Sequence, residues 1–301
     1  MPATSDFLDS EVLSQLMGWP LHARQPMLGS VSGRHASPIR GSSLEFAEYR
    51  KYVPGDDLRR LDWRAWGRSD RFYIKEFEAD TNLRLCIIID TSGSMNFIPE
   101  GSVSKLDYAR QLAGYLSYLA IQQGDAVGLY CAGEVFQKEI PPRRNPAHLR
   151  VIMENLSEIK AEGETGLPAA LHEAAEKIPQ RALVVVISDL FIQPEILNDA
   201  FQHLNFRRHD VAIFHLLGKS EVEFQFDRPT RFVDMEEDSS VLADPTIISE
   251  QYQNALHQYL GKMDAIVQST GADYHRIQLP EPPGQVLADF LVRRTPKKSG
   301  R

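Results

Sequence analysis

The sequence has few cysteines, no long apolar run and no excess of basic residues. Two of its 301 residues are cysteines, and both lie inside apolar stretches, so we expect Cys86 and Cys131 to be buried free thiols. The longest apolar runs reach only the length of a strand, which argues against a membrane-spanning helix. A net charge of -8 argues against a general nucleic-acid-binding protein.

The beginning of the sequence lacks the pattern of a secretion signal. MPATSDFLDSEVL carries acidic residues where such a signal has a basic start and an apolar stretch. Because the cysteines are also expected to be reduced, we predict a cytoplasmic protein. The apolar fraction of 43% and the charged fraction of 25% are those of a soluble globular protein. We find no internal repeat and no low-complexity tract.

The first part of the chain differs in character from the rest. Residues 5–17 predict a short amphipathic helix begun by Ser5 or Asp6, and an irregular loop rich in glycine, serine and arginine follows to residue 43. Residues 44–81 combine charged and aromatic side chains with a turn at PGDD and an alternating strand pattern over 71–78. We therefore predict four regions, namely 1–43, a β-rich module at 44–81, a main domain at 82–280 and a C-terminal helix with a basic tail at 281–301.

From residue 83 onward, predicted strands and helices alternate. Apolar runs predict strands at 85–89, 126–132, 134–140, 181–187, 211–217, 231–235 and 274–279, with Pro141 and Pro142 closing a hairpin formed by the second and third. Apolar stripes predict helices at 105–123, 146–159, 167–178, 195–206, 247–268 and 284–292. This alternation predicts an α/β fold with a doubly wound, mostly parallel sheet.

Oxygen-bearing side chains follow two of the predicted buried strands. The run LRLCIII ends in DTSGS (90–94), and RALVVVI ends in Ser188 and Asp189. Thr165 precedes a helix in the connection that leads to the second strand, so it can reach the same edge of the sheet, where ligands bind in such folds. An oxygen-only set suits Mg²⁺, with Mn²⁺ and Ca²⁺ as alternatives. The candidate ligands are Asp90, Ser92, Ser94, Thr165 and Asp189.

The same residues also allow other interpretations, namely a degenerate site or the active site of an enzyme. Ser92 and Thr165 could cap helices and Asp189 could complete a turn, which would leave a scaffold with a degenerate site. A metal-dependent phosphohydrolase of the haloacid dehalogenase type needs a second Asp two residues after the first, where this chain has Ser92. A serine hydrolase needs a positioned histidine, and Ser92 does not stand in a G-x-S-x-G sequence. We therefore predict a protein that is not an enzyme.

The residues DTSGS, Thr165 in GETGLPAAL and Asp189 together resemble the metal-ion-dependent adhesion site of von Willebrand factor A domains, over about residues 82–280. The resemblance implies that the hydroxyls bind the metal and that Asp189 acts directly or through water. It also implies that an acidic group of a partner protein completes the coordination. The chain departs from the pattern at Leu190, where many members have glycine. An extracellular domain of this type is disfavoured because the signal sequence is lacking.

The upstream sequence resembles the bacterial family called domain of unknown function 58. The resemblance covers about Gly33 to Thr81 and is most specific in PGDD, Arg59, DW (62–63) and EFE (76–78). It implies that the protein works with a MoxR-type AAA+ ATPase and its client as an adaptor in chaperone-like protein maturation. Many members carry N-terminal membrane helices, which this sequence does not show. We therefore expect a cytoplasmic adaptor with a protein partner, no nucleic-acid partner and no membrane span.

Overall fold

The computed structural model describes residues 8–24, 45–51, 73–78, 83–133, 136–178, 181–224, 226, 228–236 and 239–295. Its internal contacts divide the chain into two compact units, residues 1–22 with 84–301 and residues 23–83. In the smaller unit, β1 (Glu45–Lys51) pairs antiparallel with β2 (Tyr73–Glu78). The strand predicted over 71–78 is thus found as β2. The predicted PGDD turn lies outside the described residues.

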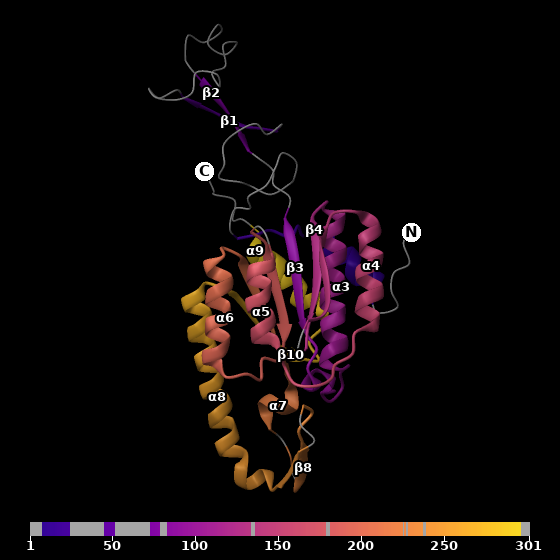
Figure 1. Cartoon of the computed structure of the whole chain (residues 1–301), viewed down its shortest axis with the longest axis vertical. Coiled ribbons are helices and arrows are strands. Elements are labelled where there is room, and N and C mark those ends of the chain that lie inside the picture. Colours follow the sequence, from indigo (N-terminus) through magenta and orange to yellow (C-terminus); the bar gives the residue numbers. More distant parts are fainter. Residues whose placement is uncertain are drawn as a thin grey trace. The chain divides into compact units, whose positions relative to one another are not determined.

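The larger unit, in which Figure 1 labels β3, β4 and β10, is built on a six-stranded sheet. The order of its strands is β10-β7-β6-β3-β4-β5. All neighbouring strands are parallel except β4 and β5, which confirms the predicted doubly wound, mostly parallel fold. The strands are β3 (Arg84–Asp90), β4 (Ala126–Ala132), β5 (Phe136–Arg143), β6 (Leu183–Ser188), β7 (Asp210–Gly218) and β10 (Asp273–Leu279). Strands β3, β4, β6 and β7 are almost wholly buried, as their continuous apolar runs predict.

Helices cover both faces of this sheet. On one face, β3 and β6 direct Cys86, Ile88, Val184 and Val186 into a core formed with three helices, namely α5 (Leu167–Lys177), α6 (Pro194–Phe206) and α8 (Pro245–Thr270). In Figure 1 these three helices lie together beside the sheet. The other helices of this unit are α1 (Ser10–Leu16), α3 (Lys105–Gln122), α4 (Pro146–Glu158), α7 (Lys219–Glu223) and α9 (Pro283–Arg294). Cys86 and Cys131 are buried and free as predicted, and burial raises the pKa of each thiol to about 12.

The last helix, α9, is joined to the sheet by a buried ion-pair cluster. The Arg294 guanidinium donates to both carboxylate oxygens of Asp210 at 2.8 and 2.9 Å and to Asp273 at 3.2 Å. Asp210 opens β7 and Asp273 opens β10. Phe290 of α9 packs edge-on against Phe214 of β7, with ring centroids 5.1 Å apart. One helix residue therefore holds the amino ends of two neighbouring strands.

The strand order reverses between β3 and β6. From β3 the chain proceeds outward through β4 and β5, then returns to the other side of β3 and continues through β6, β7 and β10. The connections that leave β3 and β6 therefore diverge and form a crevice at the carboxyl ends of the two strands, where open α/β sheets bind ligands. Asp90 ends β3, and Asp189 directly follows β6.

Several boundaries differ from the sequence predictions. Strand β5 continues through Pro141 and Pro142, which were predicted to close the hairpin, because an edge strand tolerates a missing N–H group. Helix α1 begins at Ser10, with Asp9 as its N-cap, so the predicted start at Ser5 or Asp6 was wrong. The predicted strand 231–235 is found as β8 (Thr230–Val233), which pairs with an unpredicted β9 (Ser240–Ala243). Helix α7 was also not predicted. None of the described helices has the length and apolar character needed to cross a bilayer.

Candidate metal centre

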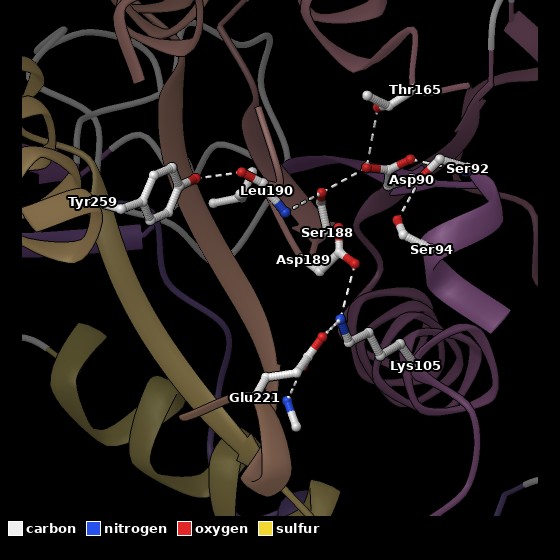
Figure 2. A network of polar contacts seen from close by, with 11 residues as sticks. Asp90, Ser92, Ser94, Lys105, Thr165, Ser188, Asp189, Leu190, Glu221 and Tyr259 are labelled. Carbon is white, nitrogen blue, oxygen red and sulfur yellow. Dashed lines mark hydrogen bonds and ion pairs between the residues drawn. The ribbon is translucent and has the colours of Figure 1, made fainter. Parts of the chain in front are cut away.

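Asp90 lies at the centre of a polar network at the carboxyl edge of the sheet (Figure 2). Its carboxylate is only 1% exposed. Oδ1 accepts a hydrogen bond from the Ser92 amide at 3.0 Å, and Oδ2 accepts one from the Ser188 hydroxyl at 2.6 Å. The Thr165 hydroxyl lies 3.4 Å from the same Oδ2. Asp90 thus receives donors from the ends of β3 and β6 and from the loop before α5.

The loop that carries Ser92 and Ser94, called the serine loop below, turns sharply after β3. A 3₁₀ turn, η2 (Gly93–Asn96), follows Ser92, and the Ser92 and Ser94 hydroxyl oxygens lie 3.1 Å apart. The Gly93 amide donates to the Gly163 carbonyl at 2.8 Å. A Cβ atom at position 93 would lie 2.0 Å from the Met235 carbonyl oxygen, so the backbone contact requires glycine. The DTSGS turn is therefore fixed between two other loops.

Thr165 joins the loop before α5 to this site. Its hydroxyl faces Asp90 and also accepts a hydrogen bond from the Leu167 amide at 3.3 Å in the first turn of α5. The Glu162 amide donates to the Thr91 carbonyl at 2.9 Å, which holds the loop against the end of β3. The N-cap of α5 is Gly166, so Thr165 lies one residue before the helix and its hydroxyl connects the first turn of α5 to Asp90.

Asp189 points toward the ammonium group of Lys105, as Figure 2 shows. Its Oδ2 pairs with the ammonium group of Lys105 at 2.9 Å, and the same ammonium pairs with Glu221 at 2.8 Å. The Lys105 side chain is fully buried and lies over the rings of Phe97 and Phe191. The structure therefore brings Asp90, Ser92, Ser94 and Thr165 together, while Lys105 holds the fifth predicted ligand.

Lys105, Ser188 and Glu221 belong to the network but were not predicted from the sequence. Lys105 begins an amphipathic helix, where a lysine is usually solvated, and its acidic partners are 84 and 116 residues away along the chain. Ser188 offered a signal, because a polar residue directly precedes Asp189 at the end of a buried apolar strand. Its hydroxyl makes the shortest hydrogen bond to Asp90 and also accepts from the Leu190 amide at 2.8 Å.

Leu190 adopts the backbone conformation that glycine favours. Its φ angle is 54°, in the left-handed region, and the Tyr259 hydroxyl donates to its carbonyl oxygen. The leucine side chain is fully buried in the core shared by α5, α6 and α8. The departure from the adhesion-site pattern at this position therefore leaves a glycine-like turn, and the side chain packs into the core.

The electrostatics of the network leave negative charge uncompensated. Burial, together with the neighbouring Asp189 carboxylate, raises the pKa of Asp90 to about 6, although hydrogen bonds from Ser188 and Ser92 oppose the increase. Within the network drawn in Figure 2, Lys105 is the single cation beside Asp90, Asp189 and Glu221. A bound cation would offset this excess.

The described residues hold no cluster of three or more histidine, cysteine, aspartate or glutamate side chains suited to a metal, so hydroxyl oxygens would have to supply part of the coordination. The donor set of Asp90, Ser92, Ser94 and Thr165 fits a hard cation in that way.

A cavity of about 270 Å³ adjoins the serine loop. Ser94 and Lys105 form part of its wall, and the remaining walls are mainly aromatic and apolar, including Phe97, Phe191 and Tyr252. Phe191 is 48% exposed at its rim. The candidate metal centre therefore lies beside an apolar hollow that opens to solvent.

A comparison with known protein families shows to which family this chain belongs. The family described as "Protein of unknown function DUF58" matches residues 48–259. The chain belongs to this family. Among the relatives of this chain, uncharacterised proteins of Mycobacterium tuberculosis and Mycobacterium bovis are each 26% identical over 221 residues, covering 72% of this chain and 69% of theirs.

A solved structure agrees with the fold of this DUF58 protein. The conserved hypothetical protein BatB of Bacteroides thetaiotaomicron matches with a TM-score of 0.50 and 13% identity, over 71% of this chain and 98% of BatB. The von Willebrand factor A domain of SpRpn10 has a TM-score of 0.42 and 12% identity, over 69% of this chain and 95% of that domain. At 13% identity, the likeness to BatB concerns the fold alone.

Proposed function

We propose that this DUF58 protein is a non-enzymatic interaction adaptor that binds an acidic side chain of a partner protein through a metal ion. Asp90, Ser92, Ser94 and Thr165 would hold the metal, with Mg²⁺ as the favoured ion, and Asp189 would contribute if Lys105 releases it. The observation that carries the proposal is the convergence of these four side chains, from two loops, at the point where the strand order reverses.

The metal would supply a positive charge in a site whose carboxylates outnumber its cations. Ser92 and Ser94 offer neutral oxygens, so the ion would keep positive charge and attract a further carboxylate. Ser188 holds Asp90 in place through a 2.6 Å hydrogen bond. This chemistry suits recognition of an Asp or Glu side chain presented by another protein.

The proposed partner is a MoxR-type AAA+ ATPase, or the client protein on which it acts. The support is the sequence resemblance of the upstream signature to a family associated with such ATPases. Membership in the DUF58 family is consistent with this partner.

Ser92, two residues after Asp90, favours a binding function over hydrolysis. A phosphohydrolase of the type considered above needs a carboxylate there to shuttle protons, and this chain has Ser92, whose hydroxyl lies beside that of Ser94. A serine hydroxyl cannot replace a carboxylate as a general acid or base near neutral pH. We therefore propose that the site binds a carboxylate without chemical turnover.

We expect the purified chain to bind a MoxR-type ATPase in Mg²⁺ and to lose at least about tenfold in affinity in EDTA, because one ion-bridged carboxylate contact would disappear. Asp90→Ala should show the same loss in Mg²⁺. Biolayer interferometry with the immobilised ATPase measures both effects.

Asp199→Ala is the matched control, because Asp199 is an exposed aspartate on α6. It should bind like the wild type. Binding that is insensitive to both EDTA and Asp90→Ala would contradict the metal bridge. Hydrolysis of a phosphomonoester that Asp90→Ala abolishes would favour the enzyme alternative.

A further inference from the structure

The turn between β8 and β9 places a carboxylate of this same chain on the candidate metal loops. The Thr165 amide donates a hydrogen bond to Glu236 Oε2 at 3.3 Å. One residue earlier, the Met235 carbonyl lies directly against Gly93, in the middle of the serine loop. The turn therefore touches both loops that carry the candidate ligands.

The local geometry of the turn holds Glu236 in this position. The Glu236 amide donates to the Asp234 side chain at 2.8 Å, and the Asp234 amide donates to the Ser239 carbonyl at 2.9 Å. These hydrogen bonds close the turn and fix the residue that follows Met235. Glu236 is half-buried, and no cationic side chain among the described residues pairs with it. A carboxylate is thus held at an edge that already has excess negative charge.

We propose that Glu236 is a further ligand of the metal and occupies, from within the chain, the coordination position that a partner's acid must take. This inference rests on the proposed metal centre. Thr165 links the two groups, because its amide binds Glu236 while its hydroxyl faces Asp90. A cation among these oxygens would compensate the charge of Glu236 and retain the turn against the serine loop.

The hairpin that carries Glu236 is lightly packed, so a partner can displace it. Val241 and Leu242 of β9 are 65% and 73% exposed. Little apolar surface would therefore be exposed when the turn moves away. The base of β8 is anchored, because Phe232 stacks on Phe224 with ring centroids 5.7 Å apart. Displacement would also change the aromatic cavity, since Phe232 and Met235 line it.

The first test is calorimetric titration with Mg²⁺ alone. Glu236→Gln keeps an oxygen that can accept from the Thr165 amide but removes the charge, and we expect its Mg²⁺ dissociation constant to rise about tenfold. Glu162→Gln is the matched control, because Glu162 is an exposed glutamate on the loop that carries Thr165. It removes the same charge and should leave the Mg²⁺ affinity within about twofold at 0.15 M salt.

The second test measures whether Glu236→Gln opens a coordination position on the metal to an added carboxylate. The protein is loaded with Mn²⁺, and ¹³C-labelled acetate serves as the smallest carboxylate probe. In the wild type and in Glu162→Gln, Glu236 should keep acetate from the metal, so Mn²⁺-dependent relaxation of the acetate carboxyl carbon stays small. In Glu236→Gln, with Mn²⁺ kept above its dissociation constant, this relaxation should increase several-fold.

Two results would overturn the inference. If Glu236→Gln binds Mg²⁺ as tightly as the wild type and gives no additional acetate relaxation, Glu236 is not a ligand. The metal centre itself would still stand, provided that Ser92→Ala/Ser94→Ala abolishes Mg²⁺ binding. If the wild-type chain binds no Mg²⁺, the inference and the proposed function fail together.

Discussion

Replacing Lys105 by methionine should lower the free energy of unfolding by about 3–5 kcal/mol, because two carboxylates would lose their buried cation. The Lys105 side chain is fully buried, and its ammonium binds Asp189 at 2.9 Å and Glu221 at 2.8 Å. Methionine fills a similar volume, so the loss would come from uncompensated charge and not from a cavity. Urea denaturation followed by circular dichroism measures the difference.

Two comparisons separate this effect from a general loss of lysine. Lys262→Met removes a lysine whose ion pair with Glu195 is largely exposed, so the cost should stay below about 1 kcal/mol. Adding Asp189→Asn and Glu221→Gln to Lys105→Met removes the unpaired charges and should recover most of the lost stability. A cost below about 1 kcal/mol for Lys105→Met alone would show that the ion pairs do not stabilise the fold.

Arg294→Met should cost a similar amount, about 3–5 kcal/mol, at the opposite edge of the sheet. The buried guanidinium holds Asp210 through two hydrogen bonds and Asp273 through a third. Its loss would remove three charge-assisted hydrogen bonds from two buried carboxylates and would release α9 from the starts of β7 and β10. The same urea titration measures this change.

Arg276→Met provides the control for Arg294. Arg276 also binds a carboxylate with two contacts, to Asp264, but both side chains are 42% exposed. Its replacement should cost less than about 1 kcal/mol because water compensates the lost pair. Equal costs for the two arginine variants would mean that burial does not determine the strength of these ion pairs.

The fold could be predicted because its strands and helices have strong and different periodicities. The central runs of β3 and β6, LCIII and LVVVI, are continuously apolar, and α5 and α6 show clear apolar stripes. The alternation of elements and the type of sheet could therefore be predicted. The hairpin β8–β9 is short and mostly exposed, which leaves little pattern in its sequence. The length of β5 was misjudged because proline is tolerated at a sheet edge.

The candidate site could be predicted only where its residues follow a recognisable strand or helix. Asp90 ends a buried strand, the two serines follow it in the next loop, and Thr165 precedes a helix. Their meeting at one edge of the sheet could therefore be predicted from topology. Lys105 and Glu236 reach the site through tertiary packing of segments distant in sequence. No local pattern marks such contacts. The orientation of Asp189 also depended on Lys105 and could not be foreseen without it.

The most direct test of the proposed metal centre is a calorimetric titration of Mg²⁺ into the wild-type chain and into Ser92→Ala/Ser94→Ala. Because two hydroxyl ligands would be lost without any change in charge, the wild type should bind one ion per chain and the double variant should bind at least about tenfold more weakly. Equal binding by the two proteins, or no binding by the wild type at millimolar Mg²⁺, would contradict the proposal that this edge of the sheet is a metal-dependent docking site.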